Sequence, residues 1–171
     1  MKKLIARAAL LLLVPMLASA QTADHVYHVE GYGFVADEAT VGPAGGGGGE
    51  VFVYKGLGLG GEFVKAGSPF GEIMVSANAY CGVPSTKKNK FEPFVTGGYT
   101  LFYVPGVGLP HANGGNIGAG ANIWLTKHAA LRLEGRATRG GRDISIDYEP
   151  WGNSYTAPQN VFSFRIGVTF R

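Results

Sequence analysis

The feature that most constrains the fold is an alternation of apolar and other side chains that recurs in segments of about ten residues. In the clearest case, VFSFRIGVTFR at residues 161–171, apolar side chains occupy every second position: Phe162, Phe164, Ile166, Val168 and Phe170. Arg165 and short residues lie between them. Successive side chains of a β-strand point to opposite faces, so this segment predicts a strand with one apolar face and one face that carries an arginine.

The same alternation predicts seven further strands. They cover residues 25–36, 50–55, 58–67, 71–81, 91–103, 116–126 and 128–140. The segment 50–55, EVFVYK, is apolar on both faces, and the strands number eight only if a turn separates it from the next one. Gly56 and Gly58 permit such a turn. Helical periodicity is absent after the first 20 residues, so we expect an all-β fold.

The connections between these segments alternate in character. Residues 37–49, DEATVGPAGGGGG, read as a flexible glycine loop; residues 107–115 read as a loop, and residues 141–159 form the longest connection. If the chain starts on the periplasmic side, these three and the short GSP at 67–69 lie outside. The connections KG, PSTKKNK and TKH then lie inside. Long external loops with short periplasmic turns are typical of outer-membrane barrels, although GSP and PSTKKNK fit that bias poorly.

The first 20 residues have the three parts of a secretory signal peptide. Lys2, Lys3 and Arg7 form a basic region, an apolar run follows, and Ala18-Ser19-Ala20 provides a cleavage site. We expect cleavage after Ala20, so that residues 1–20 are a signal peptide and residues 21–171 form one domain. The apolar run is too short to span a bilayer.

Loss of the signal peptide also removes the basic character of the chain. The full sequence has 15 Lys and Arg against 12 Asp and Glu, and three of the basic residues precede the cleavage site. The remainder has 12 groups of each sign, which gives no reason to expect a nucleic-acid partner. Cys81 is the single cysteine, so an internal disulfide is excluded.

Alternation alone does not distinguish a soluble barrel, with its apolar face inward, from a membrane barrel, with that face outward. Tilted strands of about nine to eleven residues match the bilayer core, which favours the membrane barrel. The polar face carries equal numbers of both charges: Glu30, Glu62, Glu134, Arg132, Arg136 and Arg165. An eight-stranded lumen is just wide enough for side chains to fill, so we expect these six to pair as a structural network. A pore lining is the alternative, but porin channels need about 16 strands or more.

Three stretches carry a resemblance to a known family. FSFRIGVTFR, GNIGAGANIWLTKHAALRLEGR and FEPFVTGGYTLFY resemble the small outer-membrane β-barrel family that includes OmpA- and OmpX-type domains. The resemblance implies an eight-stranded antiparallel up-and-down transmembrane β-barrel in the outer membrane, in contact with outer-membrane lipid. It also implies recognition by the outer-membrane barrel assembly machinery through a terminal signal, here Phe164, Ile166, Val168 and Phe170. Family members commonly end in an aromatic residue, whereas here Arg171 follows Phe170.

Other motifs do not support a cofactor or a reaction. GLGLGG at residues 56–61 matches G-x-G-x-x-G, but a strand and not a helix follows it. On a strand, His25 and His28 point to opposite faces, so they are not a metal pair. No G-x-S-x-G elbow is present. We therefore predict no cofactor, no metal site and no catalytic residues.

These observations predict an integral outer-membrane β-barrel of structural or surface-interaction type, monomeric and not an enzyme. Three alternatives stay open: a narrow passive solute pore, a soluble periplasmic barrel that binds an apolar ligand, and an outer-membrane lipid-modifying enzyme. The last external loop is the best candidate for external contact, through Tyr148, Trp151 and Tyr155. The alternation at residues 143–147 is also compatible with a hairpin that extends beyond the membrane.

Overall fold

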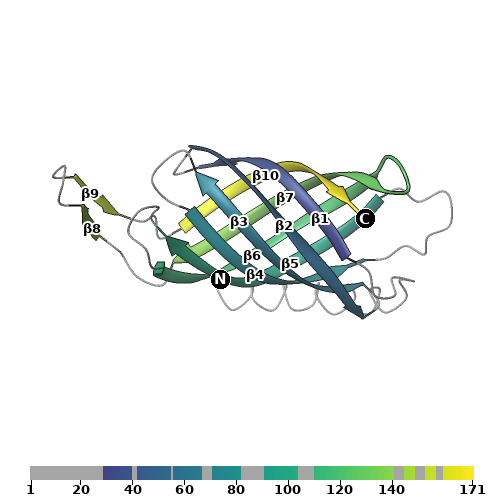
Figure 1. Cartoon of the computed structure of the whole chain (residues 1–171), viewed down its shortest axis with the longest axis horizontal. Helices are drawn as coiled ribbons and strands as arrows, with labels where there is room; N and C mark the ends of the chain where they lie inside the picture. Colours follow the sequence, from purple (N-terminus) through teal and green to yellow (C-terminus); the bar gives the residue numbers. More distant parts are fainter. Residues whose placement is uncertain are drawn as a thin grey trace, which may run out of the picture.

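The computed structural model describes residues 29–39, 42–54, 56–66, 71–81, 91–103, 110–140, 145–148, 153–156 and 160–171. The predicted signal peptide lies outside these residues. In the described part of the chain, eight long strands close into an antiparallel barrel, and two short strands form a separate hairpin beyond one end (Figure 1). Within these same ranges, no helix is long and apolar enough to cross a membrane.

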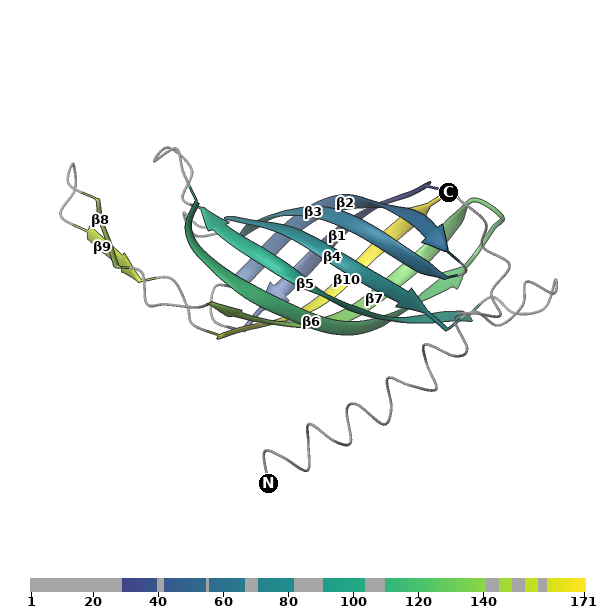
Figure 2. The ribbon, with the colours of Figure 1, turned by 90° about the horizontal axis from the view of Figure 1, so that it is seen from below.

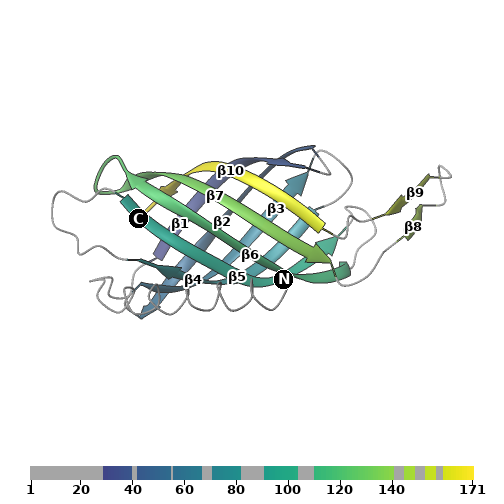
Figure 3. The ribbon, with the colours of Figure 1, turned by 180° about the vertical axis from the view of Figure 1, so that it is seen from behind.

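The strands follow one another around the barrel in chain order. The barrel strands are β1 (Val29–Glu38), β2 (Gly42–Tyr54), β3 (Leu57–Ala66), β4 (Gly71–Tyr80), β5 (Phe91–Tyr103), β6 (Pro110–Trp124), β7 (Ala129–Gly140) and β10 (Asn160–Phe170). The hairpin consists of β8 (Ser145–Tyr148) and β9 (Asn153–Thr156). The views from below and from behind show the same tilted strands on every side (Figures 2 and 3).

Closure of the barrel depends on the pairing of the first strand with the last. β1 and β10 run antiparallel in a register from Gly31 opposite Phe170 to Glu38 opposite Ser163. Each strand then has two neighbours, so no barrel strand presents an unpaired edge. The predicted eight-stranded antiparallel barrel is confirmed.

The turn that decides the strand count lies between β2 and β3. Gly56 has a φ of 77°, a left-handed conformation that favours glycine, and β3 begins at the next residue. Gly58, the other glycine considered for this turn, lies within β3 and faces the lumen. The separation of residues 50–55 from the following strand is therefore confirmed.

The interpretation of residues 37–49 as a flexible glycine loop is wrong. Its glycines form the first half of β2 and pair with both β1 and β3. An ideal Cβ at Gly46 would lie 2.7 Å from Cζ of Phe34, and one at Gly48 would lie 2.9 Å from the hydroxyl oxygen of Tyr32. The glycines thus make room for aromatic rings of the neighbouring strand, a packing reason for glycine within a strand.

Two other connections also contain more strand than the sequence indicated. β6 begins at Pro110, inside the stretch 107–115 that we expected to be a loop. The longest connection contains β8 and β9, which pair from Ser145 opposite Thr156 to Tyr148 opposite Asn153. Residues 145–147 of the alternating stretch lie in β8, but this hairpin is a separate sheet and does not continue the barrel strands.

We name the barrel ends by their connections. The turn end is where residues 125–128 join β6 to β7, and the loop end is the one beyond which β8 and β9 lie (Figure 1). Large apolar side chains on the outer face are exposed, among them Ile117 at 64%, Phe162 at 58% and Phe170 at 57%. The alternate positions face the lumen and are buried, as Val161, Ser163, Arg165 and Thr169 are along β10.

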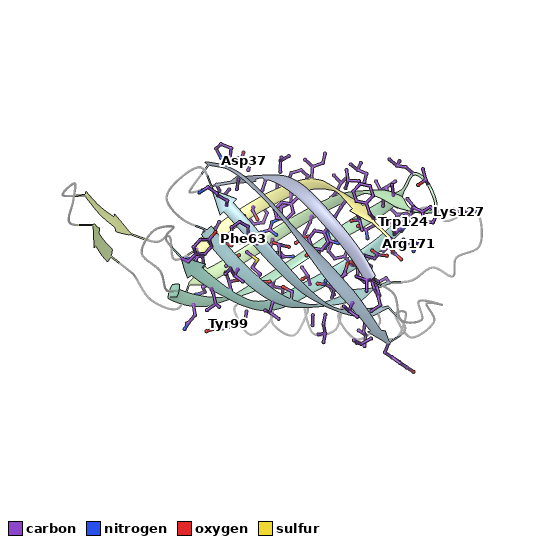
Figure 4. The ribbon with its side chains drawn as sticks, viewed as in Figure 1. Asp37, Phe63, Tyr99, Trp124, Lys127 and Arg171 are labelled. Carbon is purple, nitrogen blue, oxygen red and sulfur yellow. The ribbon has the colours of Figure 1, made fainter. Side chains whose placement is uncertain are left out.

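Most exposed aromatic side chains of the outer face lie toward one of its two ends, while Phe164 lies at the middle of β10. Tyr54, Phe91 and Phe170 lie toward the turn end, and Phe63 and Tyr99 lie toward the loop end. Figure 4 shows Phe63 and Tyr99 on the loop side of the wall. An apolar band between two aromatic girdles is the outer surface of a transmembrane barrel.

Candidate functional site: the charged lumen

The charged side chains of the lumen follow from the alternation within β7 and β10. Arg132, Glu134 and Arg136 occupy every second position of β7, so all three point to the same face. Arg165 lies on β10 directly opposite Glu134. The three arginines are at most 2% exposed, so all of them are enclosed by the barrel wall.

The centre of the lumen holds two glutamates shared by two arginines. Nε of Arg136 donates to Oε1 of Glu134 at 2.5 Å, and its Nη1 lies 3.4 Å from Oε1 of Glu62. Arg165 also pairs with Glu62, and its Nη1 lies 3.9 Å from Oε1 of Glu134. Tyr32 adds a hydrogen bond from its hydroxyl to Oε2 of Glu62 at 3.1 Å. These contacts connect β3 with β7 and β10, which are not its neighbours in the barrel wall.

A second group of contacts is organised around Arg132. Its Nη2 lies 3.2 Å from Oε2 of Glu134, and its Nη1 lies 3.5 Å from Oε1 of Glu50. Glu50 also accepts hydrogen bonds from the hydroxyl of Tyr80 and, at 2.5 Å, from Nδ2 of Asn78. The guanidinium carbon of Arg132 lies 4.1 Å from the centroid of the Phe94 ring, a cation–π contact. This group connects β2, β4 and β5 with β7.

The turn end of the lumen contains a third group, built on Arg171. The guanidinium carbon of Arg171 lies 3.8 Å from the Trp124 ring, and its Nη1 lies 3.9 Å from Oε1 of Glu30. Nε1 of Trp124 donates to Oε2 of Glu92 at 2.9 Å. Figure 4 shows Trp124 and Arg171 together at this end. The last arginine of the sequence thus belongs to the lumen contacts.

The structure therefore brings together five of the six predicted network residues and places the sixth elsewhere. Arg132, Arg136, Arg165, Glu62 and Glu134 form one continuous set of ion pairs. Glu30 is buried near the turn end, where Arg171 pairs with it.

The predicted network leaves out four further glutamates, which the structure places in the lumen: Glu38, Glu50, Glu72 and Glu92. Glu38 and Glu50 lie on either side of the β2 glycines, whose stretch has the sequence character of a loop. Glu72 shares the face of Met74 and could have been found by extending the alternation of β4 by one step. Among the described residues, seven buried glutamates face three buried arginines, so acids exceed bases in the lumen.

The energetic consequence of this arrangement is that single members are hard to remove. Leaving a buried charge without its partner costs about 3–5 kcal/mol. Because its ion pairs join strands that are not neighbours, the arrangement can hold distant strands together across the lumen.

In the described ranges, no group of three or more His, Cys, Asp or Glu side chains is arranged to hold a metal ion.

Cys81 lies just past β4, outside the barrel strands. Its backbone nitrogen donates to the carbonyl oxygen of Pro93 at 2.8 Å. Partial burial raises the pKa of its thiol, which keeps the sulfur protonated and weakly nucleophilic.

The other predicted site residues lie on β10 and on the hairpin. Phe164, Ile166, Val168 and Phe170 all face outward, with exposures from 41% to 57%. Tyr148 and Tyr155 are the last residue of β8 and the third of β9. Trp151 lies outside the described residues. Tyr148 pairs with Asn153, and Tyr155 pairs with Ile146.

Comparison with solved structures finds the same fold in proteins of low sequence identity. The N-terminal β-barrel domain of OprF from Pseudomonas aeruginosa superposes with a TM-score of 0.60 at 15% identity, covering 83% of this chain and 95% of that domain. A de novo designed transmembrane β-barrel gives a TM-score of 0.59 at 17% identity, covering 83% and 92%. Neisserial surface protein A gives a TM-score of 0.50 at 15% identity, covering 84% and 96%.

These similarities concern the fold alone. No protein-family model matches the chain, and no curated protein matches it. The shared architecture is a small β-barrel, found both in a natural domain and in a designed transmembrane barrel.

Proposed function

We propose that this protein is an outer-membrane β-barrel of structural or surface-interaction type, whose lumen is filled by its own side chains. The observation that carries the proposal is the pairing of an apolar outer wall with a lumen crossed by ion pairs. Arg136 and Arg165 both reach Glu62 on the far side of the barrel. Side chains held in this way leave little room for a solute, and no catalytic role is part of the proposal.

The location in the outer membrane is supported by two features. The outer wall has exposed apolar side chains between aromatic girdles. The solved barrels with the same fold include an outer-membrane-type natural domain and a designed transmembrane barrel. On this proposal, the signal peptide is cleaved after Ala20, and the outward residues from Phe164 to Phe170 are read by the barrel assembly machinery.

Filling of the lumen extends beyond the central ion pairs. Toward the turn end, the ring of Tyr80 lies 5.1 Å from the ring of Phe52 and 5.2 Å from that of Phe94. Arg171 lies beyond this aromatic cluster, over Trp124. Because the closed sheet also has no unpaired edge, the proposal includes a monomeric barrel.

The hairpin of β8 and β9 is the proposed site of surface contact. It lies beyond the loop end, separate from the barrel sheet (Figure 1). Tyr148 and Tyr155 on its two strands, and Trp151 between them, supply aromatic side chains of the kind enriched at interfaces.

Electrical recording in planar bilayers tests the filled lumen. The protein refolded from its mature sequence should show heat-modifiable mobility on gels, which reports barrel formation, and no discrete conductance steps. Regular steps from the wild-type protein would contradict the proposal. The double variant Glu62→Ala with Arg165→Ala removes both partners of one ion pair that crosses the lumen. It serves as the control for whether a less filled lumen gives conductance steps in the same recording.

A cation-selective pore is the second candidate function. It is favoured by the excess of buried glutamates over arginines in the described lumen. Oε1 of Glu38 and Oε2 of Glu72, toward the loop end, have no hydrogen-bond partner within the described residues. In a salt gradient, a cation-selective pore should give a current whose reversal potential has the sign expected for cation flow. A filled lumen should give no current, so no reversal potential would be measured.

A further inference from the structure

The outer wall has a groove of about 470 Å³ that runs along β7 at the loop end. Ala137 forms its floor, and the larger side chains of Ile117 on β6 and Phe162 on β10 rise on either side of it. The floor is therefore a small residue, Ala137, between two large apolar neighbours.

Arg139 closes this groove at the loop end. It is the next outward residue of β7 after Ala137, it is exposed, and it lies directly opposite Asn160 on β10. Within the ranges that the structure describes, no carboxylate forms an ion pair with Arg139. An arginine on the lipid-facing side of a barrel strand is tolerated near the membrane interface and disfavoured deeper. Its position at the strand end puts it at the level where lipid headgroups lie.

We propose that this groove binds a lipid with a phosphate headgroup. An acyl chain lies over Ala137 between Ile117 and Phe162, and the phosphate is bound by Arg139. The planar guanidinium group of Arg139 binds phosphate oxygens through two parallel hydrogen bonds. The inference rests on the proposed membrane location of the barrel.

The combination of groove and charge selects a lipid over other occupants. A free phosphate would use Arg139 and gain nothing from the apolar floor. A second copy of the chain would have to bury Arg139 against its own apolar outer wall, where an unpaired charge is costly. A phosphate-bearing lipid fits both the apolar groove and Arg139, because its acyl chain lies in the membrane while its attached headgroup lies at the membrane interface.

Native mass spectrometry of the refolded protein in detergent micelles tests the proposal, with dimyristoyl phosphatidylglycerol as the probe. The wild type should retain one lipid. Arg139→Gln should weaken retention about tenfold, as expected for loss of a charge-assisted bidentate contact. Ala137→Phe, which fills the floor, should weaken it by a similar factor. Lys65 is an outward cation on β3 that lies at the loop end, as Arg139 does, but outside the groove. The control variant Lys65→Gln should therefore leave lipid retention unchanged.

Two further probes separate the sources of the interaction. Dimyristoylglycerol has the acyl chains without the phosphate. It should bind weakly, and to the same extent, to the wild type and to Arg139→Gln. Inorganic phosphate at millimolar concentration should not displace the retained lipid. Displacement by inorganic phosphate, or equal retention of the lipid by wild type, Arg139→Gln and Ala137→Phe, would overturn the proposal, as would a dimer in place of the lipid complex.

Barrel formation is measured separately for each variant by heat-modifiable mobility. A wild-type protein that forms no barrel in micelles would contradict the proposed function. If the barrel forms correctly but Arg139→Gln retains the lipid as well as the wild type does, only the proposed lipid site is contradicted. If Ala137→Phe fails to form the barrel, the comparison of Arg139→Gln with Lys65→Gln decides the matter.

Discussion

The inner and outer faces of β7 differ in what each position requires. On the inner face, Glu134 contacts three arginines, and each of its contacts depends on a particular atom of a particular partner. On the outer face, Leu131 and Leu133 need only an apolar surrounding, which acyl chains can supply in many arrangements. The comparison teaches that one strand can be strictly specified on one side and loosely specified on the other, because side chains fill the lumen and fluid lipid covers the wall.

The largest expected effect is at the centre of the inner face. Glu134→Ala should reduce the free energy of unfolding by about 3–5 kcal/mol, because it leaves buried arginines without a shared carboxylate. Urea titration of the refolded protein in lipid vesicles, followed by the gel mobility shift, measures this change. Leu133→Ala, the outward neighbour, is the matched control and should cost less than half as much, since lipid refills the space. Equal losses for the two variants would remove the distinction between the faces.

The glycine strand β2 should show the second largest effect. In Gly46→Ala, the new methyl group would overlap the carbonyl oxygen of Phe63 and the ring of Phe34. We expect a loss of about 1–3 kcal/mol, the usual cost of overpacking, in the same urea titration. Gly45→Ala is the control, because its Cβ would lie 3.6 Å from the nearest atom, an ordinary contact. A Gly46→Ala variant as stable as Gly45→Ala would show that the rings do not need the glycines.

Arg171 should contribute less, because it is partly exposed. Arg171→Ala removes the contact with Trp124 and the ion pair with Glu30. We expect a loss of about 1 kcal/mol, in the range of a cation–π contact of this exposure. Acrylamide quenching of Trp124 fluorescence, in a Trp151→Phe background, should increase in the variant. Arg171→Lys should restore part of the protection, and unchanged quenching in Arg171→Ala would mean that Arg171 does not cover the ring.

The smallest effect is expected on the outer face of β4. Val75 is 61% exposed, so Val75→Leu should change the free energy of unfolding by less than about 0.5 kcal/mol. Val64 makes the comparison, because it faces the lumen and is 1% exposed. Val64→Leu adds the same methylene to a filled space and should cost about 1–3 kcal/mol. The urea titrations of the two variants would contradict the account if Val75→Leu proved the more disruptive.

Much of the fold could be predicted because alternation is a local property. The strand β10 shows its two faces in eleven residues, and the inward positions of Arg132, Glu134 and Arg136 follow from their spacing alone. β2 could not be recognised in the same way. Glycines have no side chain to alternate, and the reason for them lies on β1, in the rings of Tyr32 and Phe34.

The partners within the candidate site could not be predicted, because they depend on how the barrel closes. Arg165 and Glu62 are 103 residues apart and meet only across the lumen. Arg171 looked like a departure from a terminal aromatic signal, since nothing in its sequence neighbourhood indicates the Trp124 ring. The excess of lumen glutamates does not follow from the sequence, because Glu38 falls in the stretch interpreted as a loop and Glu50 in a short segment that looks apolar on both faces.

The central claim is that the apolar face of the strands contacts lipid while the charged face lies inside. Spin labels on single cysteines at Phe162, Ser163, Phe164, Arg165 and Ile166, in a Cys81→Ser background, test it in lipid vesicles. We predict collision rates with lipid-soluble oxygen that are high at Phe162, Phe164 and Ile166 and low at Ser163 and Arg165. Rates without this alternation, or with high values at Ser163 and Arg165, would contradict the account.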